Sequence, residues 1–437
     1  MTRLFVLALA VCAATAVPLA AQAPLGLETF DAAWTIVRDS HFDPAMNGVD
    51  WNAVRAELRP RAAEAANPGE LRAVIRDMLG RLGQSHFALI PATADSPRAS
   101  AADGNGDPGF DYRLVGRDLL VTYVDPHGGA AAAGVRTGWR LMSIESKPVS
   151  EILDTISSSA PERLRNVQIW SLVEHRLRGP EGSRVAVMFE NGSGGTIGMA
   201  VERRPEQGQP VTVGNLPTMY VRVDAERHRT PGGGSVGVIR FNVWMAAVDQ
   251  LFQKAMDDFR ASDGIVIDLR VNPGGLAAML MGISGHFIAE RKPLGVMKTR
   301  DNELHFVANP RLVNASGARV DVFGGPVAIL VDALTGSASE CFTGGMQSLG
   351  RARVFGQTSM GQALPALFDK LPNGDVLIHA YGDFVTADGT RLEGRGVIPD
   401  QPVPLTRADL LANRDATLDA ALAWIDRTRT GTRLQHP

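Results

Sequence analysis

A serine, Ser337, stands in a short turn between an apolar run and a run typical of a helix. The apolar run, residues 327–331, predicts a buried strand, and the helical run begins near Cys341. The turn between them reads Thr335-Gly336-Ser337-Ala338-Ser339-Glu340. Such a turn exposes a hydroxyl beside the unpaired N–H groups of a helix N-terminus, an arrangement that suits a nucleophile and an oxyanion. The other interpretation is a capping box, with Glu340 three residues after the serine.

The first residues of the chain resemble a secretory signal. Residues 1–23 contain an apolar stretch from Leu4 to Leu19 and a small-x-small sequence at Ala21-Gln22-Ala23. Pro24 disfavours cleavage directly before it, so the cleavage position stays open. The apolar stretch is short for a membrane span, so we expect no stable membrane anchor. The sequence therefore predicts a periplasmic or secreted protein.

Composition excludes several function classes. A length of 437 residues suits two or three domains, and a net charge of −3 without a dense basic run gives no sign of a nucleic-acid partner. Removal of the signal would also remove Cys12, and Cys341 would then be the one cysteine of the mature chain. We therefore expect no internal disulfide, and we expect Cys341 to be a small buried hydrophobic residue. No cluster has metal-ligand spacing, and His41-Phe42-Asp43 is too sparse for a site. We therefore expect no metal and no cofactor.

Three segments with different patterns follow the signal. Residues 24–91 show helical spacing and end in a loop at Gln84-Ser85-His86, ahead of a strand-like run. Residues 92–108 are rich in Ala, Ser, Asp, Gly and Pro, which indicates a linker. Residues 109–205 combine short strands with small helices, and residues 215–427 alternate strands and helices. The last segment predicts an α/β fold with a largely buried sheet.

The segment 109–205 resembles a PDZ domain. Its order is strand, small-residue helix, Gly-x-x-x-Gly, strand, turn, helix and strand pair. A PDZ domain offers a sheet edge and a groove to an extended peptide. The loop for a peptide carboxylate would lie near Gly109-Phe110-Asp111-Tyr112, which departs from the usual Gly-Leu-Gly-Phe. Binding of a free C-terminus therefore stays open, and a generic small β module is the alternative.

Four motifs follow one another in the C-terminal segment. They are Ile267-Asp268-Leu269-Arg270-x-Asn272-Pro273-Gly274-Gly275, Ser337-Ala338-Ser339-Glu340, Gly356-Gln357-Thr358 with Met360-Gly361, and Glu393-Gly394-Arg395-Gly396-Val397-Ile398-Pro399-Asp400. With the PDZ-like segment, this set resembles the C-terminal processing (tail-specific) proteases and their tricorn-core relatives. The resemblance implies a crotonase-like ββα core, an N-terminal helical region and cleavage of peptide bonds through Ser337.

That family divides by its general base. One branch uses a lysine, and the matching position here is Gln362, which cannot accept a proton from a hydroxyl at neutral pH. The only lysine after Ser337 is Lys370. It precedes a predicted hairpin turn at residues 371–374, which favours a solvated strand end. The lysine branch is therefore disfavoured.

The tricorn-like branch uses serine, histidine and glutamate. The resemblance assigns the histidine to His86, with Gln84 standing where the family motif has Asp, and the glutamate to Glu393. A near-neutral imidazole suits a general base that later acts as an acid, and a carboxylate would orient it and stabilise its charged form. The resemblance further implies that Ser85 bridges Glu393 to the histidine. Four other histidines have no supporting motif and are expected to be structural: His127, His286, His305 and His379.

The backbone around Ser337 supplies the remaining expectations. The N–H groups of Ala338 and of the Gly274-Gly275 turn would form an oxyanion hole, since glycines allow close approach of the substrate. A simple tight turn is the alternative. Ser339 fits a capping role better than Ser337 does, which favours Ser337 as the nucleophile.

The sequence thus predicts a secreted serine endopeptidase that cleaves extended or unfolded polypeptides through an acyl-enzyme. The second interpretation is a non-catalytic peptide- or ligand-binding protein, because position 362 lacks lysine; the presence of both His86 and Glu393 argues against it. The third is an esterase or amidase for small acyl substrates, which the PDZ-like segment disfavours. The natural substrate and the formation of a homo-oligomer stay open.

Overall fold

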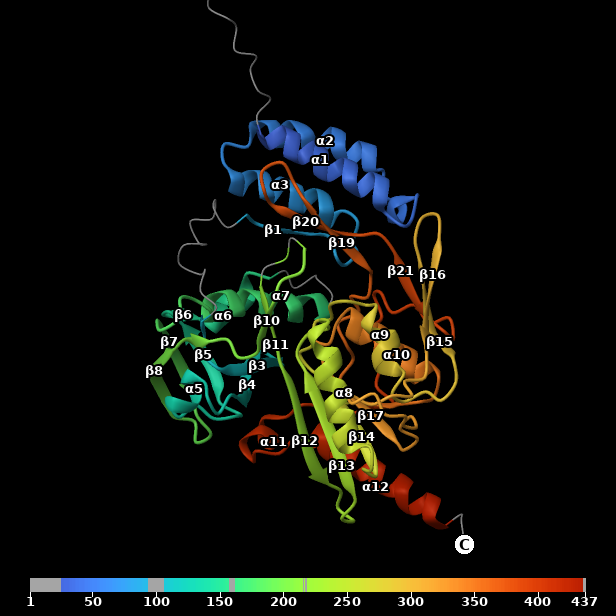
Figure 1. The fold of residues 1–437 in the computed structure, drawn as a ribbon. Helices are drawn as coiled ribbons and strands as arrows, with labels where there is room; N and C mark the ends of the chain where they lie inside the picture. The colour runs from blue at the N-terminus through green and yellow to red at the C-terminus, as the bar shows by residue number, and fades with distance from the viewer. Residues whose placement is uncertain (1–24, 93–105, 157–161, 215, 217, 435–437) are drawn as a thin grey trace, which may run out of the picture.

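The computed structural model describes residues 25–92, 106–156, 162–214, 216 and 218–434. The predicted signal, residues 1–23, lies outside them, as does most of the predicted linker. Three units follow along the chain: a helical bundle (25–92), a middle unit (106–205) and a C-terminal unit (218–434) (Figure 1). In the described part of the chain, no helix combines the length and the apolar character needed to cross a membrane.

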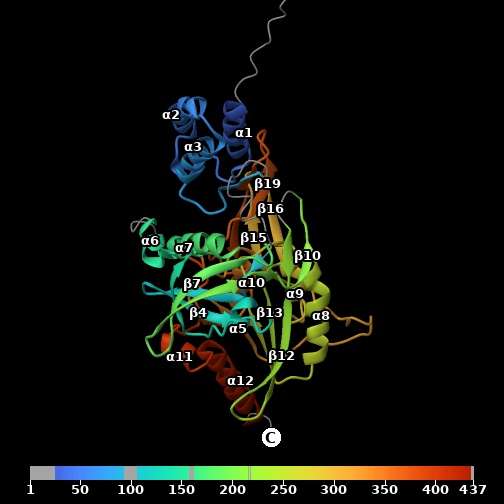
Figure 2. The ribbon, with the colours of Figure 1, turned by 90° about the vertical axis from the view of Figure 1, so that its left-hand side faces the viewer.

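The bundle consists of α1 (Leu25–Ser40), the short turn η1 (Met46–Gly48), α2 (Trp51–Glu64) and α3 (Pro68–Gly80). Asp50 and Asn67 begin α2 and α3 as N-caps, because their side chains accept the free N–H groups of the first turn. The chain then forms β1 (Ala88–Ile90), which pairs antiparallel with β20 (Val376–Ala380) of the C-terminal unit. This pairing joins the bundle to the C-terminal unit (Figure 1). The second view shows α1, α2 and α3 at the end of the molecule next to β19 (Figure 2).

The middle unit contains β2 (Gly106–Asp107), β3 (Phe110–Val115), β4 (Asp118–Val124), α5 (Gly129–Ala132), β5 (Arg140–Ile144), β6 (Lys147–Pro148), α6 (Val149–Asp154), α7 (Glu162–Leu177), β7 (Arg184–Glu190), β8 (Thr196–Glu202) and β9 (Arg204–Pro205). Its main sheet is antiparallel, in the order β3-β4-β5-β7-β8. Residues 106 and 107, predicted as linker, instead form β2 and pair with β9, so the two ends of this unit close on each other.

The C-terminal unit contains β12 (Val223–Arg229), β13 (Ser235–Phe241), α8 (Ala247–Phe259), β14 (Gly264–Asp268), α9 (Met279–Ser284), β15 (Lys292–Lys298), β16 (Glu303–Ala308), β17 (Val327–Val331), α10 (Ala338–Ser348), β18 (Arg353–Gly356), β19 (Ala366–Lys370), β20, β21 (Asp383–Thr386), β22 (Gln401–Pro402), α11 (Arg407–Leu411) and α12 (Ala416–Leu434). Ahead of β12, β10 (Gln209–Val211) pairs antiparallel with β11 (Met219–Val221). Its main sheet has the order β12-β13-β14-β17-β18-β22, parallel from β13 onward.

The apolar runs of the sequence become the centre of this sheet. Every residue of β14 and β17 is buried, because helices cover both faces. Ile265 and Ile267 face the large apolar cluster that includes residues of α8, α9 and α10. Val266 faces the other side, where it packs with residues of α12 such as Ile425. A sheet buried on both faces fixes the positions of the loops that follow its strands.

Three expectations about single residues are confirmed. Cys341 is buried and free. Lys370 is the exposed last residue of β19, directly before the turn to β20. His379 is a structural residue: its ring nitrogens lie 2.8 Å from Ser40 Oγ and 2.6 Å from Asp369 Oδ2, which links α1 to β19.

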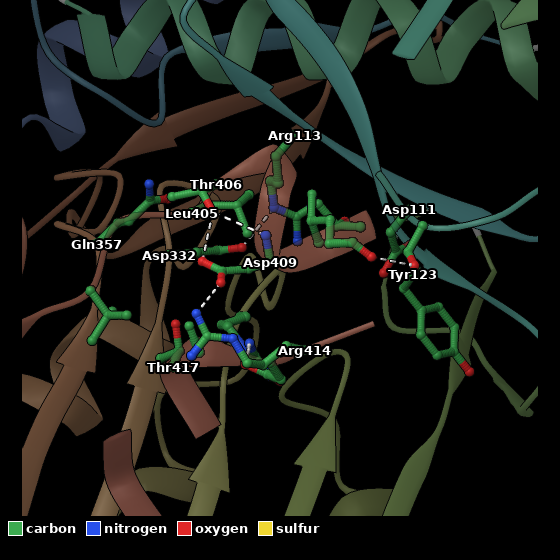
Figure 3. A pocket seen from close by; sticks show the side chains of 18 of the residues that line it. Asp111, Arg113, Tyr123, Asp332, Gln357, Leu405, Thr406, Asp409, Arg414 and Thr417 are labelled. Atoms are coloured by element: carbon green, nitrogen blue, oxygen red, sulfur yellow. Dashed lines mark hydrogen bonds and ion pairs between the residues drawn. The ribbon is translucent and has the colours of Figure 1, made fainter. Parts of the chain in front are cut away.

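A buried ion pair holds the middle unit on the C-terminal unit. Arg113 of β3 donates from Nε to Asp332 Oδ2 (2.7 Å), and both side chains are about nine-tenths buried (Figure 3). The second carboxylate oxygen of Asp332 accepts the N–H groups of Val271 and Leu334, both at 3.0 Å. Arg113 and these hydrogen bonds keep the pKa of Asp332 below its usual value although burial alone would raise it. One carboxylate therefore connects β3 to the loops after β14 and β17.

Replacing Arg113 tests that connection. Arg113→Met leaves the Asp332 charge buried without its partner, so we expect a loss of about 3–5 kcal/mol in the free energy of unfolding, measured by urea denaturation. Arg117→Met is the control, because the Arg117–Asp154 pair is largely exposed and contributes less than about 1 kcal/mol. Equal losses in the two variants would contradict this account.

Candidate active site

The site lies where β14 and β17 end. These neighbouring strands are parallel, so the loops that follow them meet at one edge of the sheet. Asn272, in the loop after β14, is fully buried, and its carbonyl oxygen accepts from the Gly336 N–H (3.0 Å) and from Ser339 Oγ (3.1 Å). Its side chain donates to the Phe241 carbonyl oxygen (2.8 Å). The two loops are thereby fixed against each other.

Ser337 sits in a strained turn directly before α10. Its φ of 52° and ψ of −119° are unfavourable for a residue with a side chain, as in the strand-to-helix turns that present nucleophiles. Its N–H lies 2.9 Å from the Gln362 carbonyl oxygen and 3.0 Å from Glu340 Oε2. The Glu340 N–H donates to the Ser337 carbonyl oxygen (2.9 Å). Glu340 thus supports the backbone of Ser337, and the Ser337 side chain stays partly exposed.

Glu340 is a buried carboxyl group surrounded by donors. Besides the Ser337 N–H, it accepts from Ser359 Oγ (2.5 Å), the Gly361 N–H (2.7 Å) and the Gln362 N–H (3.0 Å). Burial raises the pKa of Glu340 to about 7, and these hydrogen bonds counteract part of that rise. The carboxylate ties the turn at Ser337 to the loop of residues 359–362.

The expectation that Ser339 acts as the cap is wrong. Ser339 lies inside α10, one residue after its start, and is completely buried. Its hydroxyl accepts from Trp244 Nε1 (2.8 Å) and donates to the Asn272 carbonyl oxygen. The tertiary contact with Trp244, which lies 95 positions away in the chain, uses the hydroxyl that local capping would need.

His86 belongs to a hydrogen-bonded chain that starts at Glu393. Glu393 Oε2 accepts from Ser85 Oγ (2.8 Å) and Oε1 accepts from the Ser85 N–H (3.0 Å). Ser85 Oγ also lies 2.8 Å from His86 Nδ1. The Ser85 hydroxyl donates its hydrogen bond to the Glu393 carboxylate. Ser85 Oγ therefore accepts the hydrogen bond from the Nδ1–H group of His86. A neutral His86 then has an unprotonated Nε2, the form that a general base requires.

The surroundings keep His86 neutral. Although His86 as a whole residue is only partly buried, desolvation by the packed protein lowers the pKa of its imidazole to about 4. His86 also has a φ of 60°, which non-glycine residues rarely adopt. It lies two residues before β1, whose pairing with β20 fixes this loop against the C-terminal unit.

The three predicted residues gather around the segment 362–363. The Ser337 N–H donates to the Gln362 carbonyl oxygen, and the next residue, Ala363, donates its N–H to Glu393 Oε2 (2.9 Å). Glu393 is in turn hydrogen-bonded to Ser85, and Ser85 to His86. Among the described residues, no hydrogen bond joins Ser337 directly to His86. Gln362 contributes backbone atoms to the site, where the lysine branch would have a side chain.

The glycines beside Ser337 differ in what their N–H groups do. A Cβ on Gly274 would lie 2.6 Å from Ser337 Cβ and 2.8 Å from the Ala338 nitrogen, so only glycine fits there. The Gly274 N–H, however, donates to Asn272 Oδ1 (3.0 Å). Of the expected oxyanion donors, Gly275 and Ala338 are therefore better available than Gly274.

Comparison with known proteins finds family matches in two segments of the chain. The family model described as peptidase family S41 matches residues 235–403, and the tricorn protease C1 domain matches residues 27–80. Residues 235–403 are therefore similar to peptidase family S41. This is a family of serine-type peptidases, and its matched segment contains both Ser337 and Glu393.

Two relatives show how much of the chain is shared. A putative tricorn protease homolog of Streptomyces coelicolor is 25% identical over 90% of this chain, which spans about a third (32%) of that protein. A carboxyl-terminal-processing protease of Picosynechococcus is 24% identical over 85% of this chain and 82% of its own length.

Solved structures share the fold at lower identity. The photosystem II D1 C-terminal processing protease has a TM-score of 0.56 at 20% identity, covering 91% of this chain and 98% of its own. Mature CPAF complexed with lactacystin has a TM-score of 0.62 at 13% identity, covering 93% and 99%. These likenesses establish a mixed α/β peptidase fold over nearly the whole described chain.

Sequence reasoning missed the support that two carboxylates supply. Asp332 follows a buried strand directly, and a polar residue at such a strand end is a usable signal for a site. In the sequence, Glu340 could be recognised only as the glutamate of a capping box at the start of a helix. Its wider role depends on donors from residues 359–362, which no local pattern places beside it.

Gly274→Ala tests the contact with Ser337. The new methyl group would push against Ser337, and we expect the rate of Ser337 labelling by a fluorophosphonate to fall at least about 100-fold. Gly317→Ala is the matched control, because Gly317 also has a positive φ (80°) but has open space around it. Wild-type labelling by Gly274→Ala, or an equal loss in Gly317→Ala, would contradict the account.

The hydrogen-bond chain also predicts the tautomer and titration of His86. In a sample with ¹⁵N-labelled histidine, His86 should carry its proton on Nδ1 and stay neutral as the pH falls until about 4. The proton-accepting form is therefore present above about pH 4 and is lost below it. Assignment would use His86→Gln, and titration near the ordinary value of 6.5 would refute the prediction.

Proposed function

We propose that this protein is a secreted serine endopeptidase that uses Ser337, His86 and Glu393 on extended or unfolded polypeptides. The observation that carries the proposal is the chain of hydrogen bonds from Glu393 through Ser85 to His86, which leaves Nε2 of a neutral imidazole free to accept a proton. The signal-like residues 1–23 support export to the periplasm or the outside of the cell.

The three residues have different tasks in the proposed reaction. Ser337 Oγ attacks the peptide carbonyl carbon while His86 Nε2 takes the hydroxyl proton. The imidazolium then gives that proton to the departing amine, which leaves an acyl-enzyme on Ser337. A water molecule, deprotonated by His86, attacks the acyl carbon, and the proton returns to Ser337 as the acid product leaves. Glu393 stabilises the imidazolium through Ser85. Because Ser337 is not hydrogen-bonded to His86 here, the two side chains must approach during catalysis.

Oxyanion stabilisation fits the N–H groups of Gly275 and Ala338 best. Ala338 is the first residue of α10, where the N–H groups have no partner within the helix. Gly275 has a φ of 139°, a backbone conformation that glycine supplies without strain. Gly274 makes room for Ser337, and its own N–H is engaged by Asn272.

The middle unit is proposed to be a PDZ-like domain that engages the peptide, beside a crotonase-like core. A cavity of about 400 Å³ supports this, since it is lined by residues of β3 and α7 and also reaches the loop after β14 at Pro273. An extended peptide held between β3 and α7 would thus lie next to the oxyanion turn.

A non-catalytic peptide-binding protein remains the second candidate. Gln362 favours it, because the amide cannot act as the base that the lysine branch uses. The tautomer that Ser85 and Glu393 impose on His86 argues against it, since a pure binding site gains nothing from an unprotonated Nε2.

Fluorophosphonate labelling of the purified mature protein tests the proposal. We expect an adduct at Ser337, located by peptide mass spectrometry, and at least a roughly 1,000-fold slower reaction in His86→Ala. Ser337→Ala should abolish both the adduct and the cleavage of an unfolded protein substrate.

Two controls make the result decisive. Ser348→Ala removes a serine at the far end of α10, and should label like the wild type. Labelling at the wild-type rate in His86→Ala would refute His86 as the base, and a folded wild type that never labels, even with peptide added, would favour the binding protein.

A further inference from the structure

The loop that presents His86 is held in an unfavourable backbone conformation. His86 has a φ of 60°, and neither Gln84 nor Phe87 beside it is paired in a sheet. Ser85 is held by Glu393, but a strained residue persists only where its surroundings determine it from several sides. The side chains of Gln84 and Phe87 are therefore informative, because they flank the strained position.

Both flanking side chains contact one buried histidine. His41, which is completely buried, lies with Nε2 2.9 Å from Gln84 Oε1. Its ring is also stacked on Phe87, with centroids 5.6 Å apart and planes inclined by 13°. Since Oε1 can only accept, Nε2 must carry the proton of this hydrogen bond. The imidazole of His41 thus holds the residue two positions before His86 and the residue directly after it.

His41 is itself fixed to the C-terminal unit. Arg300, in the turn between β15 and β16, donates from Nε to the His41 carbonyl oxygen (3.0 Å). The Asp43 N–H donates to His41 Nδ1 (3.0 Å), and the Asp43 carbonyl oxygen lies 2.9 Å from the same nitrogen. A second hydrogen bond joins the segment 41–47 to the loop 82–87: Asn47 Nδ2 donates to the Leu82 carbonyl oxygen (2.8 Å). The segment 41–47 is therefore hydrogen-bonded both to the C-terminal unit and to the loop 82–87.

We infer that His41 is a positioning residue for His86, acting through Gln84 and Phe87. This inference rests on the proposed function, because it assumes that His86 is the base. It assigns a role to Gln84 where the family motif has another residue, since the amide supplies a neutral acceptor for His41 Nε2–H. Neither side chain touches the reacting atoms.

A double-mutant cycle tests the inference. His41→Phe keeps a flat ring beside Phe87 but removes the N–H, and Gln84→Leu removes the acceptor. We expect each to lower kcat and the rate of Ser337 labelling about 10-fold, with KM unchanged within about twofold. The double variant should be no slower than the slower single variant, because both changes break the same hydrogen bond.

His379→Phe is the matched control. It also replaces a buried histidine that links the bundle to the C-terminal unit, but its ring nitrogens are hydrogen-bonded to Ser40 and Asp369 rather than to Gln84. We expect it to label at the wild-type rate even if its Tm falls. An equal loss of rate in His379→Phe would overturn the inference, because the effect would then be general loosening of the bundle.

The remaining outcomes separate this inference from the proposed function. In one outcome, Ser337 is labelled in the wild type, labelling disappears in His86→Ala, and His41→Phe and Gln84→Leu are labelled at the wild-type rate. This outcome overturns the role of His41 alone. A wild type that does not label overturns the proposed function and this inference with it. If His41→Phe does not fold, Gln84→Leu still decides, because its partly exposed side chain can be changed without opening the apolar core.

Discussion

The Glu393 carboxylate is the interaction on which the rest of the site depends. It accepts the N–H and the hydroxyl of Ser85 from the bundle and the N–H of Ala363 from the C-terminal unit. Ser85 and Glu393 lie 308 positions apart in the chain. Because a carboxylate only accepts, these donors determine the direction of every hydrogen bond that follows, including the one that decides which nitrogen of His86 carries the proton.

Two further carboxylates act in the same way at neighbouring points. Asp332 binds Arg113 of the middle unit and the loops after β14 and β17, and Glu340 binds the turn at Ser337 and the loop 359–362. Buried charges are costly unless they are paired or fully hydrogen-bonded, so each of these groups favours one arrangement of its donors. The strained backbone of Ser337 and His86 is maintained by such arrangements rather than by local preference.

Much of the fold was predictable because it follows from hydrophobic pattern. The apolar runs before Asp268 and Asp332 became β14 and β17, and the helical spacing of residues 24–91 became α1, α2 and α3. The linker prediction failed at residues 106–107, and capping failed at Ser339, for one reason. In both cases a distant partner, β9 or Trp244, offered hydrogen bonds that local reasoning cannot count.

By itself, the sequence determined the elements, the order of the motifs and the residue types able to do the chemistry. Only the tertiary structure decided how they meet: that Glu393 reaches Ser85 and, through it, His86, and that Gln84 Oε1 accepts a hydrogen bond from His41 Nε2. The physical reason is that hydrophobic periodicity is a local property of the chain. Hydrogen-bond direction depends instead on which donors and acceptors the fold brings within about 3 Å of one another.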